Sequence, residues 1–90
     1  MKRYYVYILL STKDDNLYIG FATDLKSRLQ KHARGNVPST KSRRYLILIH
    51  YEYFINKKDA KAREVYLKSG AGHEQIRSFL KNTMQEKLKP

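Results

Sequence analysis

The sequence predicts a small α/β domain of the α+β kind, in which helices flank a three-stranded antiparallel sheet in the order β-β-α-β-α-α. Three runs rich in β-branched and aromatic residues alternate with segments of helical spacing, which is the main reason for this expectation. The chain has 90 residues, of which 41% are hydrophobic. A chain this short buries about 60–65% of the surface that it exposes when unfolded, which supports one thin core. We therefore expect one domain over residues 1–84, followed by a frayed basic tail over residues 85–90.

The first half of the chain predicts a hairpin followed by a helix. Residues 3–10 and 17–22 are mostly β-branched, aromatic or aliphatic, and the polar residues between them have the composition of a turn. Asp24 is a suitable N-cap for a helix over residues 25–34, which would end at Gly35. The leucines at the first and fifth positions of that helix mark its buried side.

The second half predicts a third strand and two more helices. After a polar loop, residues 45–54 form the most apolar run that follows the first strand. Asn56 caps a helix that runs to about Ser69, and the glycines within residues 70–72 are expected to interrupt it. Apolar residues recur at helical spacing from Ile76 onward and predict the last helix.

The charge is the most informative feature of the composition. Nineteen Lys and Arg residues against eight Asp and Glu residues give a formal net charge of +11. Such a field on a small domain favours a polyanionic partner, above all nucleic acid. The absence of cysteine excludes disulfides and thiolate zinc sites. Neither a signal peptide nor a membrane span is indicated, so we expect a cytoplasmic protein that does not bind membranes.

The predicted hairpin brings two tyrosines and a glycine together. If its loop closes with Leu10 opposite Leu17, Tyr7 lies opposite Gly20, and Tyr18 becomes a diagonal neighbour of Tyr7 on the same face. A glycine opposite a tyrosine leaves room for a ligand to approach the backbone. Any single strand tyrosine is more commonly a packing residue, so this arrangement needs support from elsewhere in the chain.

The first predicted helix provides an arginine and a histidine for the same region. Arg28 and His32 are four residues apart and therefore project from one face of the helix, beside its buried leucines. This position places both side chains next to the sheet. Taken alone, the pair is also compatible with an ordinary solvated helix face.

Together these residues resemble the GIY-YIG nuclease superfamily. The chain contains Tyr5-Val6-Tyr7, then Tyr18-Ile19-Gly20 eleven residues later, then Arg28, His32 and a lone Glu64 on a later helix. It is most similar to the small single-domain members related to the amino-terminal catalytic module of the excision-repair incision subunit. The second motif is intact, whereas a tyrosine stands at the glycine position of the first motif.

The resemblance implies a metal-dependent phosphodiesterase. Tyr7 and Tyr18 would line the site, and one of them would help to activate water. Arg28 would stabilise the phosphate in the transition state, and His32 would assist proton transfer or orient a tyrosine. Glu64 would hold a single divalent ion, Mg²⁺ or Mn²⁺.

Phosphodiester hydrolysis needs an activated water, stabilisation of charge on the phosphoryl oxygens and help for the leaving oxygen. A guanidinium and a metal ion would lower the pKa of a nearby tyrosine, as a tyrosine base requires. Glu64 is expected on the inward edge of its helix, where a salt bridge to Arg28 is the alternative to metal binding. Many family members carry an asparagine after the glutamate, and Asn82 is the candidate for it here.

Basic residues flank this set and would bind phosphates without reading sequence. They are Lys26, Lys31 and Arg34 on the first helix, and Lys41, Arg43 and Arg44 before the third strand. We therefore expect an endonuclease that hydrolyses DNA with low sequence specificity, with selectivity for substrate structure arising from shape or from a protein partner. RNA stays open as a substrate. The alternative is a non-catalytic nucleic-acid-binding module that retains this fold.

Overall fold

The centre of the molecule is a three-stranded antiparallel sheet with β1 (Tyr4–Ser11) as its middle strand. Strand β1 pairs with β2 (Leu17–Ala22) on one side and with β3 (Leu46–Phe54) on the other. The structure is a computed structural model, and it describes residues 1–88. The three predicted strands are confirmed, with bounds that differ by at most one residue.

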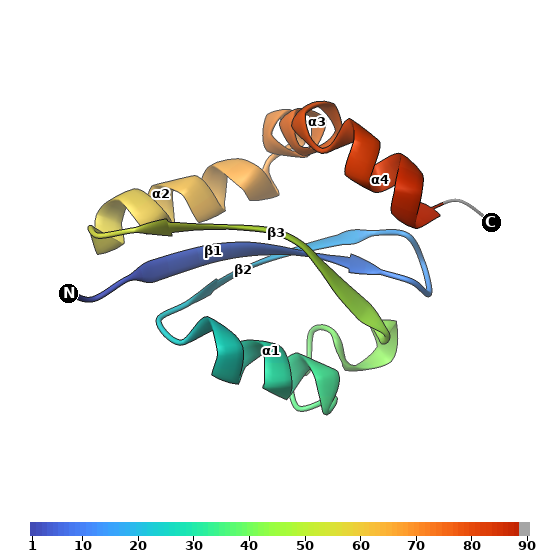
Figure 1. Ribbon diagram of the computed structural model, residues 1–90, viewed down its shortest axis with the longest axis horizontal. Helices are drawn as coiled ribbons and strands as arrows, with labels where there is room; N and C mark the ends of the chain where they lie inside the picture. The colour runs from blue at the N-terminus through green and yellow to red at the C-terminus, as the bar shows by residue number, and fades with distance from the viewer. Residues whose placement is uncertain (89–90) are drawn as a thin grey trace.

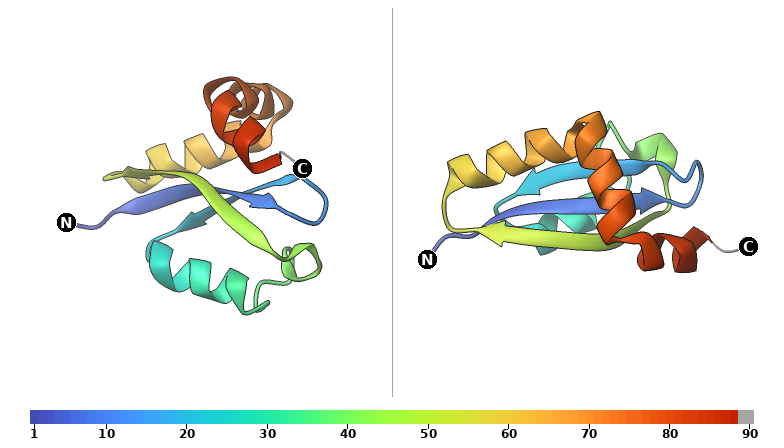
Figure 2. Two further views of the ribbon diagram at one scale, coloured as in Figure 1. Left: turned by 45° about the vertical axis from the view of Figure 1, so that its right-hand side comes forward. Right: turned by 90° about the horizontal axis from the view of Figure 1, so that it is seen from above.

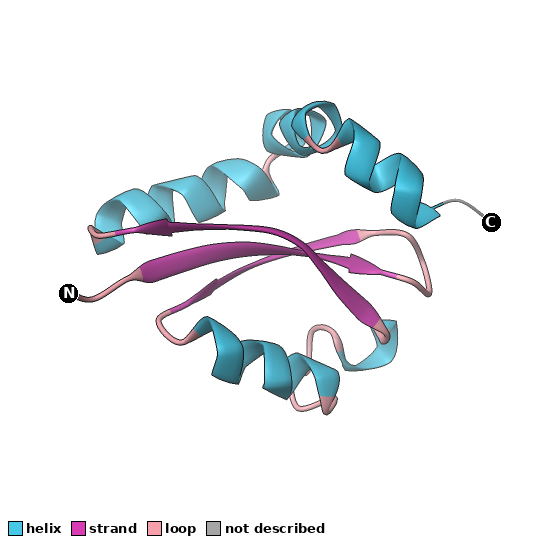
Figure 3. Cartoon of the chain, in the orientation of Figure 1, coloured by secondary structure: helices cyan, strands magenta, loops and turns pink. Residues whose placement is uncertain are grey.

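Helices cover both faces of this sheet, as Figures 1 and 2 show. Helix α1 (Leu25–Ala33) lies on one face, while α2 (Lys57–Lys68) and α3 (Gly70–Phe79) lie on the other, and α4 (Lys81–Leu88) follows α3. A short 3₁₀ helix (Lys41–Arg43) precedes β3. Figure 3 distinguishes these helices from the magenta strands between them. The predicted α+β class and the order of elements are confirmed.

The two faces of the sheet bury different side chains because successive residues of a strand point to opposite sides. The face under α2 and α3 carries the larger apolar cluster, made of Val6, Ile8, Leu10, Leu17, Ile19, Ala60, Leu67 and Ile76. The α1 face carries a smaller cluster around Tyr7, Leu9 and Ala22. Strand β1 contributes to both clusters and is the best-buried strand of the sheet.

Both ends of α1 are capped as the sequence predicts. The Asp24 side chain accepts a hydrogen bond from the backbone N–H of Ser27 at 3.0 Å. At the other end, Gly35 has a φ of +75° and its N–H donates to the carbonyl of His32 at 3.1 Å. The N–H of Asn36 donates to the carbonyl of Lys31 at 2.9 Å, which completes a Schellman motif. The last turn of α1, which carries His32, is therefore held at a defined position.

The predicted end of the second helix near Ser69 is confirmed, but residues 70–72 are not the break themselves, since this segment forms the first turn of α3. Ser69 caps that helix, because its hydroxyl accepts from the N–H of Gly72 at 3.1 Å. A side chain on Gly72 would overlap the backbone of Tyr66 and Leu67. The glycine therefore permits a close approach of α3 to α2 and does not serve as a flexible linker.

The predicted last helix is two helices, because α3 ends before Leu80 and α4 begins after it. The backbone N–H of Leu80 still donates to the carbonyl of Ile76, at 2.9 Å. Of the predicted tail over residues 85–90, residues 85–88 belong to α4, and residues 89–90 lie outside the described residues. Within residues 1–88, none of the helices has the length and apolarity that crossing a membrane requires.

Candidate active site

The hairpin has the predicted register, with Leu10 opposite Leu17 and Tyr7 opposite Gly20. Tyr18 pairs with Leu9, so it is a diagonal neighbour of Tyr7, and the centroids of the two tyrosine rings are 6.2 Å apart. A Cβ atom on Gly20 would overlap the ring and hydroxyl of Tyr7. The space opposite Tyr7, which the sequence assigns to a ligand, is therefore filled by the Tyr7 ring itself.

A chain of buried hydrogen bonds leads from Tyr7 into the loop after α1. The Tyr7 hydroxyl lies 2.8 Å from Nε2 of His32, and Nδ1 of His32 lies 2.8 Å from Oγ1 of Thr40. Tyr7, His32 and Thr40 are all at most 2% exposed. The Thr40 hydroxyl also donates to the carbonyl of Val37 at 3.5 Å. Because the Thr40 hydroxyl uses its proton in that bond, its oxygen accepts from the Nδ1–H of His32. Nε2 of His32 then carries no proton and accepts the hydrogen bond of the Tyr7 hydroxyl.

Burial keeps both partners of the Tyr7–His32 bond neutral at neutral pH. It lowers the pKa of His32 to about 4, and the positive charge of Arg28 acts in the same direction. Burial also raises the pKa of Tyr7 to about 12, although the Arg28 guanidinium opposes this rise. Arg28 thus acts on Tyr7 in the predicted direction, but burial outweighs it.

Arg28 is half-buried and lies beside both tyrosines of the site. The Tyr7 hydroxyl, with a smaller effect from Tyr18, raises the pKa of Arg28 above its usual value. Its Nε atom is buried and has no hydrogen-bond partner in the structure, which describes residues 1–88. Arg28 also lines a cavity of about 310 Å³ together with Ser27 and Lys31. A buried N–H donor without a partner is rare in native proteins and marks a position where a ligand oxygen would be stabilised.

Tyr18 is the more accessible of the two tyrosines. It is half-buried, whereas Tyr7 is fully buried. The Tyr18 ring packs edge-on against the His32 ring, with 5.1 Å between their centroids. The structure therefore brings Tyr7, Tyr18, Gly20, Arg28 and His32 into one cluster on the α1 face.

Glu64 lies outside this cluster, in the other layer of the fold. It belongs to α2, which packs on β1 and β2 from the opposite face of the sheet. Its carboxylate is paired with Lys61 at 3.5 Å and with Lys68 at 3.0 Å, and not with Arg28. The Lys61 ammonium lies 3.9 Å from the centroid of the Phe21 ring, which places this part of α2 against the strand of Tyr18 and Gly20.

A cation at this site would take a single carboxylate from the protein, and it would have to displace the two lysines that pair with that carboxylate. Within residues 1–88, no group of three or more His, Asp or Glu side chains gathers to form a cage. Mg²⁺ is commonly bound by one or two carboxylates together with substrate phosphates. Glu64, with a side chain that is 13% exposed, is the candidate for that ligand. Asn82 is exposed on α4, which packs on α3, and the structure does not bring it to the cluster.

Arg43 has a structural role that the sequence did not indicate. Its Nε donates to the Asp14 carboxylate at 3.2 Å, and a terminal nitrogen donates to the carbonyl of Leu17 at 3.1 Å. These bonds tie the hairpin to the segment before β3. The other predicted phosphate-binding residues are exposed: Lys26, Lys31, Arg34, Lys41 and Arg44.

Thr40 is the member of the buried chain that sequence reasoning missed. It stands in a loop eight residues after His32, where nothing in the local pattern marks it as buried. The available signal was indirect. A histidine that faces a sheet and gives one nitrogen to a tyrosine needs a partner for its other nitrogen, and Thr40 is the partner that the loop supplies.

The fold and this cluster define a GIY-YIG domain, and the chain belongs to that family of nucleases. The family model described as the GIY-YIG catalytic domain matches residues 3–75, which confirms the predicted resemblance. Among its relatives is a UPF0213 protein of Clostridium perfringens, 32% identical over 83 residues that cover 91% of this chain and 88% of the relative. A UPF0213 protein of Staphylococcus haemolyticus is 33% identical over 86% of this chain and 94% of its own length.

A solved structure agrees with this assignment. The solution NMR structure of a UPF0213 protein from Bacillus halodurans is similar to this chain with a TM-score of 0.55 and 35% sequence identity. The similarity covers 86% of this chain and 84% of that one. The chain thus matches small proteins of this family over nearly their whole length.

Proposed function

We propose that this protein is a divalent-metal-dependent endonuclease that hydrolyses phosphodiester bonds of DNA with low sequence specificity. The observation that carries the proposal is the position of Arg28. Arg28 lines a cavity, has a buried Nε without a partner within residues 1–88, and lies beside the buried hydrogen bond between Tyr7 and His32. Membership of a nuclease family supports the same reaction class.

Arg28 would bind the scissile phosphate. A guanidinium offers planar donors that match two phosphoryl oxygens, and its charge would stabilise the negative charge that develops in the transition state. Lys31 lines the same cavity and adds positive charge to it. Satisfying Nε of Arg28 with a phosphoryl oxygen would remove the cost of leaving this donor unpaired.

The tyrosines and His32 would move a proton from the attacking water. Tyr18 is the more exposed of the two tyrosines, so the water would lie against Tyr18 and Arg28. Tyr18 would accept the proton of this water and pass its own hydroxyl proton to the oxygen of Tyr7, which would pass its hydroxyl proton to Nε2 of His32. A neutral His32 is the form able to accept it, and the low pKa of His32 maintains that form.

Glu64 would hold the single Mg²⁺ or Mn²⁺ ion. When bound, such an ion supplies Lewis-acid charge to phosphoryl oxygens. The exposed lysines and arginines around α1 would hold the flanking phosphates, and Arg43 is withdrawn from that set by its pairing with Asp14. RNA stays an alternative to DNA as the substrate. Selectivity for substrate structure could come from a protein partner instead of the shape of the site. A cytoplasmic location stays a prediction.

The second candidate function is a non-catalytic nucleic-acid-binding module. Two observations favour it. The Glu64 carboxylate is already paired with two lysines, and the Tyr7 hydroxyl is fully buried. In such a module the Tyr7–His32–Thr40 chain would serve only to hold α1 and the following loop on the sheet.

A cleavage assay separates these two functions. Duplex, flap, branched and single-stranded DNA are incubated with the protein in Mg²⁺, in Mn²⁺ and in a chelator. We expect cleavage only with metal, and none by Glu64→Ala, which should still fold and bind DNA. Glu74→Ala is the matched control, since Glu74 is an exposed glutamate on α3. Cleavage by Glu64→Ala at the wild-type rate would show that the metal assignment is wrong. DNA binding without cleavage by the wild type would establish the module.

A further inference from the structure

Three tyrosines on the α1 face of the sheet lie beyond the catalytic cluster, and together they form a tyrosine patch: Tyr5, Tyr51 and Tyr53. Tyr5 pairs across the strands with Tyr53, and Tyr51 pairs with Tyr7. Tyr51 and Tyr53 are 52% and 53% exposed. The Tyr5 ring lies 6.0 Å from the Tyr51 ring and 6.2 Å from the Tyr53 ring, centroid to centroid. Two exposed rings and the half-buried ring of Tyr5 are thus neighbours on this face.

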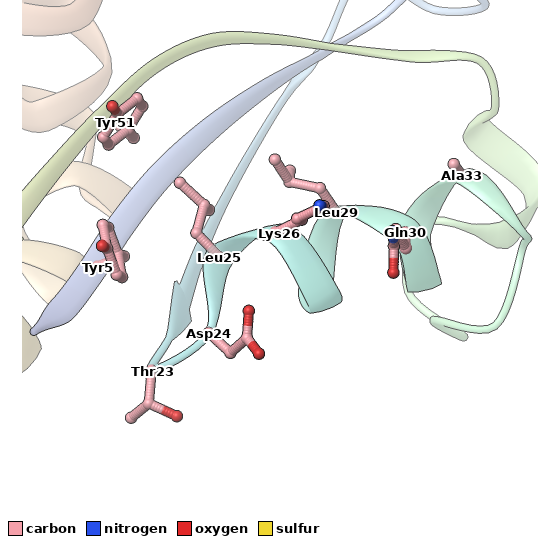
Figure 4. Close-up of a pocket in the computed structure, with 9 residues that line it drawn as sticks. All are labelled: Tyr5, Thr23, Asp24, Leu25, Lys26, Leu29, Gln30, Ala33 and Tyr51. Carbon is pink, nitrogen blue, oxygen red and sulfur yellow. The ribbon is translucent and has the colours of Figure 1, made fainter.

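A groove of about 740 Å³ runs between this patch and α1. Figure 4 shows Tyr5 and Tyr51 on its sheet side, with Leu25 and Leu29 pointing toward them from the helix. Lys26 also lines the groove. Its volume lies within the range of small-ligand sites, and its walls combine aromatic, aliphatic and cationic groups with the carboxylate of Asp24, which caps α1.

Charge restricts what can occupy this groove. The Arg3 guanidinium lies 5.1 Å from the centroid of the Tyr53 ring, and Lys26 stands on the opposite wall. The whole chain carries a net charge of +11, so two copies repel each other while a polyanion is attracted. Exposed aromatic faces beside cations are the combination with which proteins hold single-stranded nucleic acid, because unpaired bases have free faces for stacking. A base in a duplex has no such free face.

We propose that the tyrosine patch binds unpaired nucleotides of a DNA strand, with bases stacked on Tyr51 and its neighbours and phosphates near Lys26 and Arg3. Thr23 and Asp24 line both this groove and the cavity of Arg28, so a strand that leaves the patch would pass toward Arg28. The role of the patch in substrate choice rests on the proposed nuclease function. With the patch occupied in this way, the enzyme would select DNA that has a single-stranded segment beside the scissile bond.

Fluorescence provides a direct test, because the chain contains no tryptophan. The Tyr51→Trp variant of the full chain is titrated with an oligothymidylate of about ten nucleotides and with a duplex of the same length. We expect the single strand to quench the indole by stacking and the duplex to leave it nearly unchanged. Tyr51→Ala should weaken single-strand binding about 10-fold and leave duplex binding unchanged. Tyr66→Ala is the control, since Tyr66 is an exposed tyrosine on α2, in the opposite layer.

Three results would overturn the proposal: no quenching by the single strand, an equal loss of both DNA affinities in Tyr51→Ala, or a dimer in sedimentation that Tyr51→Ala abolishes. The last would assign the patch to a second copy of the chain. Binding is measured without metal and without cleavage, so the two proposals fail separately. Tyr51-dependent stacking without any cleavage would remove the nuclease function and keep the binding site, and cleavage without stacking would do the reverse.

Discussion

The two faces of the sheet use their buried residues in different ways. Under α2 and α3 the buried side chains are apolar, and they include three alternate residues of β1 and Leu67 of α2. Under α1, the buried set includes Tyr7, His32 and Thr40, which satisfy one another by hydrogen bonds. Burying polar groups costs free energy unless they are paired, and the hydrogen bonds within this set offset that cost. The difference indicates that the face under α2 and α3 mainly stabilises the fold, whereas the α1 face carries every member of the candidate site except Glu64.

Two arginines show the same contrast. Arg63, on the α2 side, donates two hydrogen bonds of 2.9 Å to the Glu52 carboxylate, which also lies 3.0 Å from Nε2 of His50. Burial would raise the pKa of Glu52, but its bonds to Arg63 and His50 hold that pKa below its usual value. Arg28, on the α1 side, has a buried Nε without such a partner. The satisfied arginine is structural, and the unsatisfied one is the candidate for substrate binding.

The largest expected effect separates these two arginines. Arg28→Ala should reduce DNA cleavage about 10³-fold, the scale of one lost transition-state donor, with little change in the free energy of unfolding. Arg63→Ala should leave the cleavage rate of the folded protein unchanged and lower the free energy of unfolding by about 1–3 kcal/mol, because Glu52 loses its partner. Cleavage rates and denaturant unfolding of both variants measure this. The opposite assignment of effects would contradict the division between the two faces.

A smaller effect is expected from the apolar core. Leu67→Ala should lower the free energy of unfolding by about 2–5 kcal/mol, because Leu67 lies on the buried side of α2 and is fully buried in the core. Cleavage by the fraction that stays folded should not change. Val65→Ala on the same helix is the control, since Val65 is 70% exposed and should cost less than about 0.5 kcal/mol. Denaturant titration compares the two, and equal losses would show that the α2 face is not the stabilising core.

The buried histidine gives a pH dependence that belongs to the α1 face. The pKa of His32 is about 4 in the folded protein and 6.5 in the unfolded chain, so the unfolded chain binds more protons between these values. Stability should therefore fall by roughly 3 kcal/mol as the pH drops from 6.5 to 4, and this contribution should level off below that. His32→Gln should lack this part of the loss. Identical pH profiles of unfolding for the two proteins would show that His32 is not held neutral by the fold.

Much of the fold could be predicted because it depends on local patterns. Alternation in the first strand separated the residues of the two faces, and the polar turn gave the register that places Tyr7 opposite Gly20. The cap at Asp24 and the glycine at the end of α1 located that helix to within one residue. These features depend only on residues that are close in the sequence, which is why they could be predicted without the structure.

The parts that could not be predicted depend on contacts between distant segments. Arg43 pairs with Asp14, which is 29 residues away, and its basic character alone indicated a phosphate contact. The break between α2 and α3 was predicted, but the sequence did not show that Gly72 belongs to α3, because its close approach to α2 arises only from helix packing. The burial of Tyr7 raised its pKa where the sequence indicated the opposite, since nothing local reveals how completely α1 covers that ring.

The central claim is that Tyr7 takes part in the reaction and is not only a packing residue. Measuring the DNA cleavage rates of Tyr7→Phe and Tyr4→Phe in the same metal tests it most directly. Both changes remove one hydroxyl and keep the ring, but Tyr4 lies on the other face, stacked on Phe21 at 6.3 Å. We expect Tyr7→Phe to be at least about 10²-fold slower than the wild type with unchanged DNA affinity, and Tyr4→Phe to be nearly as fast as the wild type. Equal rates for the two variants would contradict the claim.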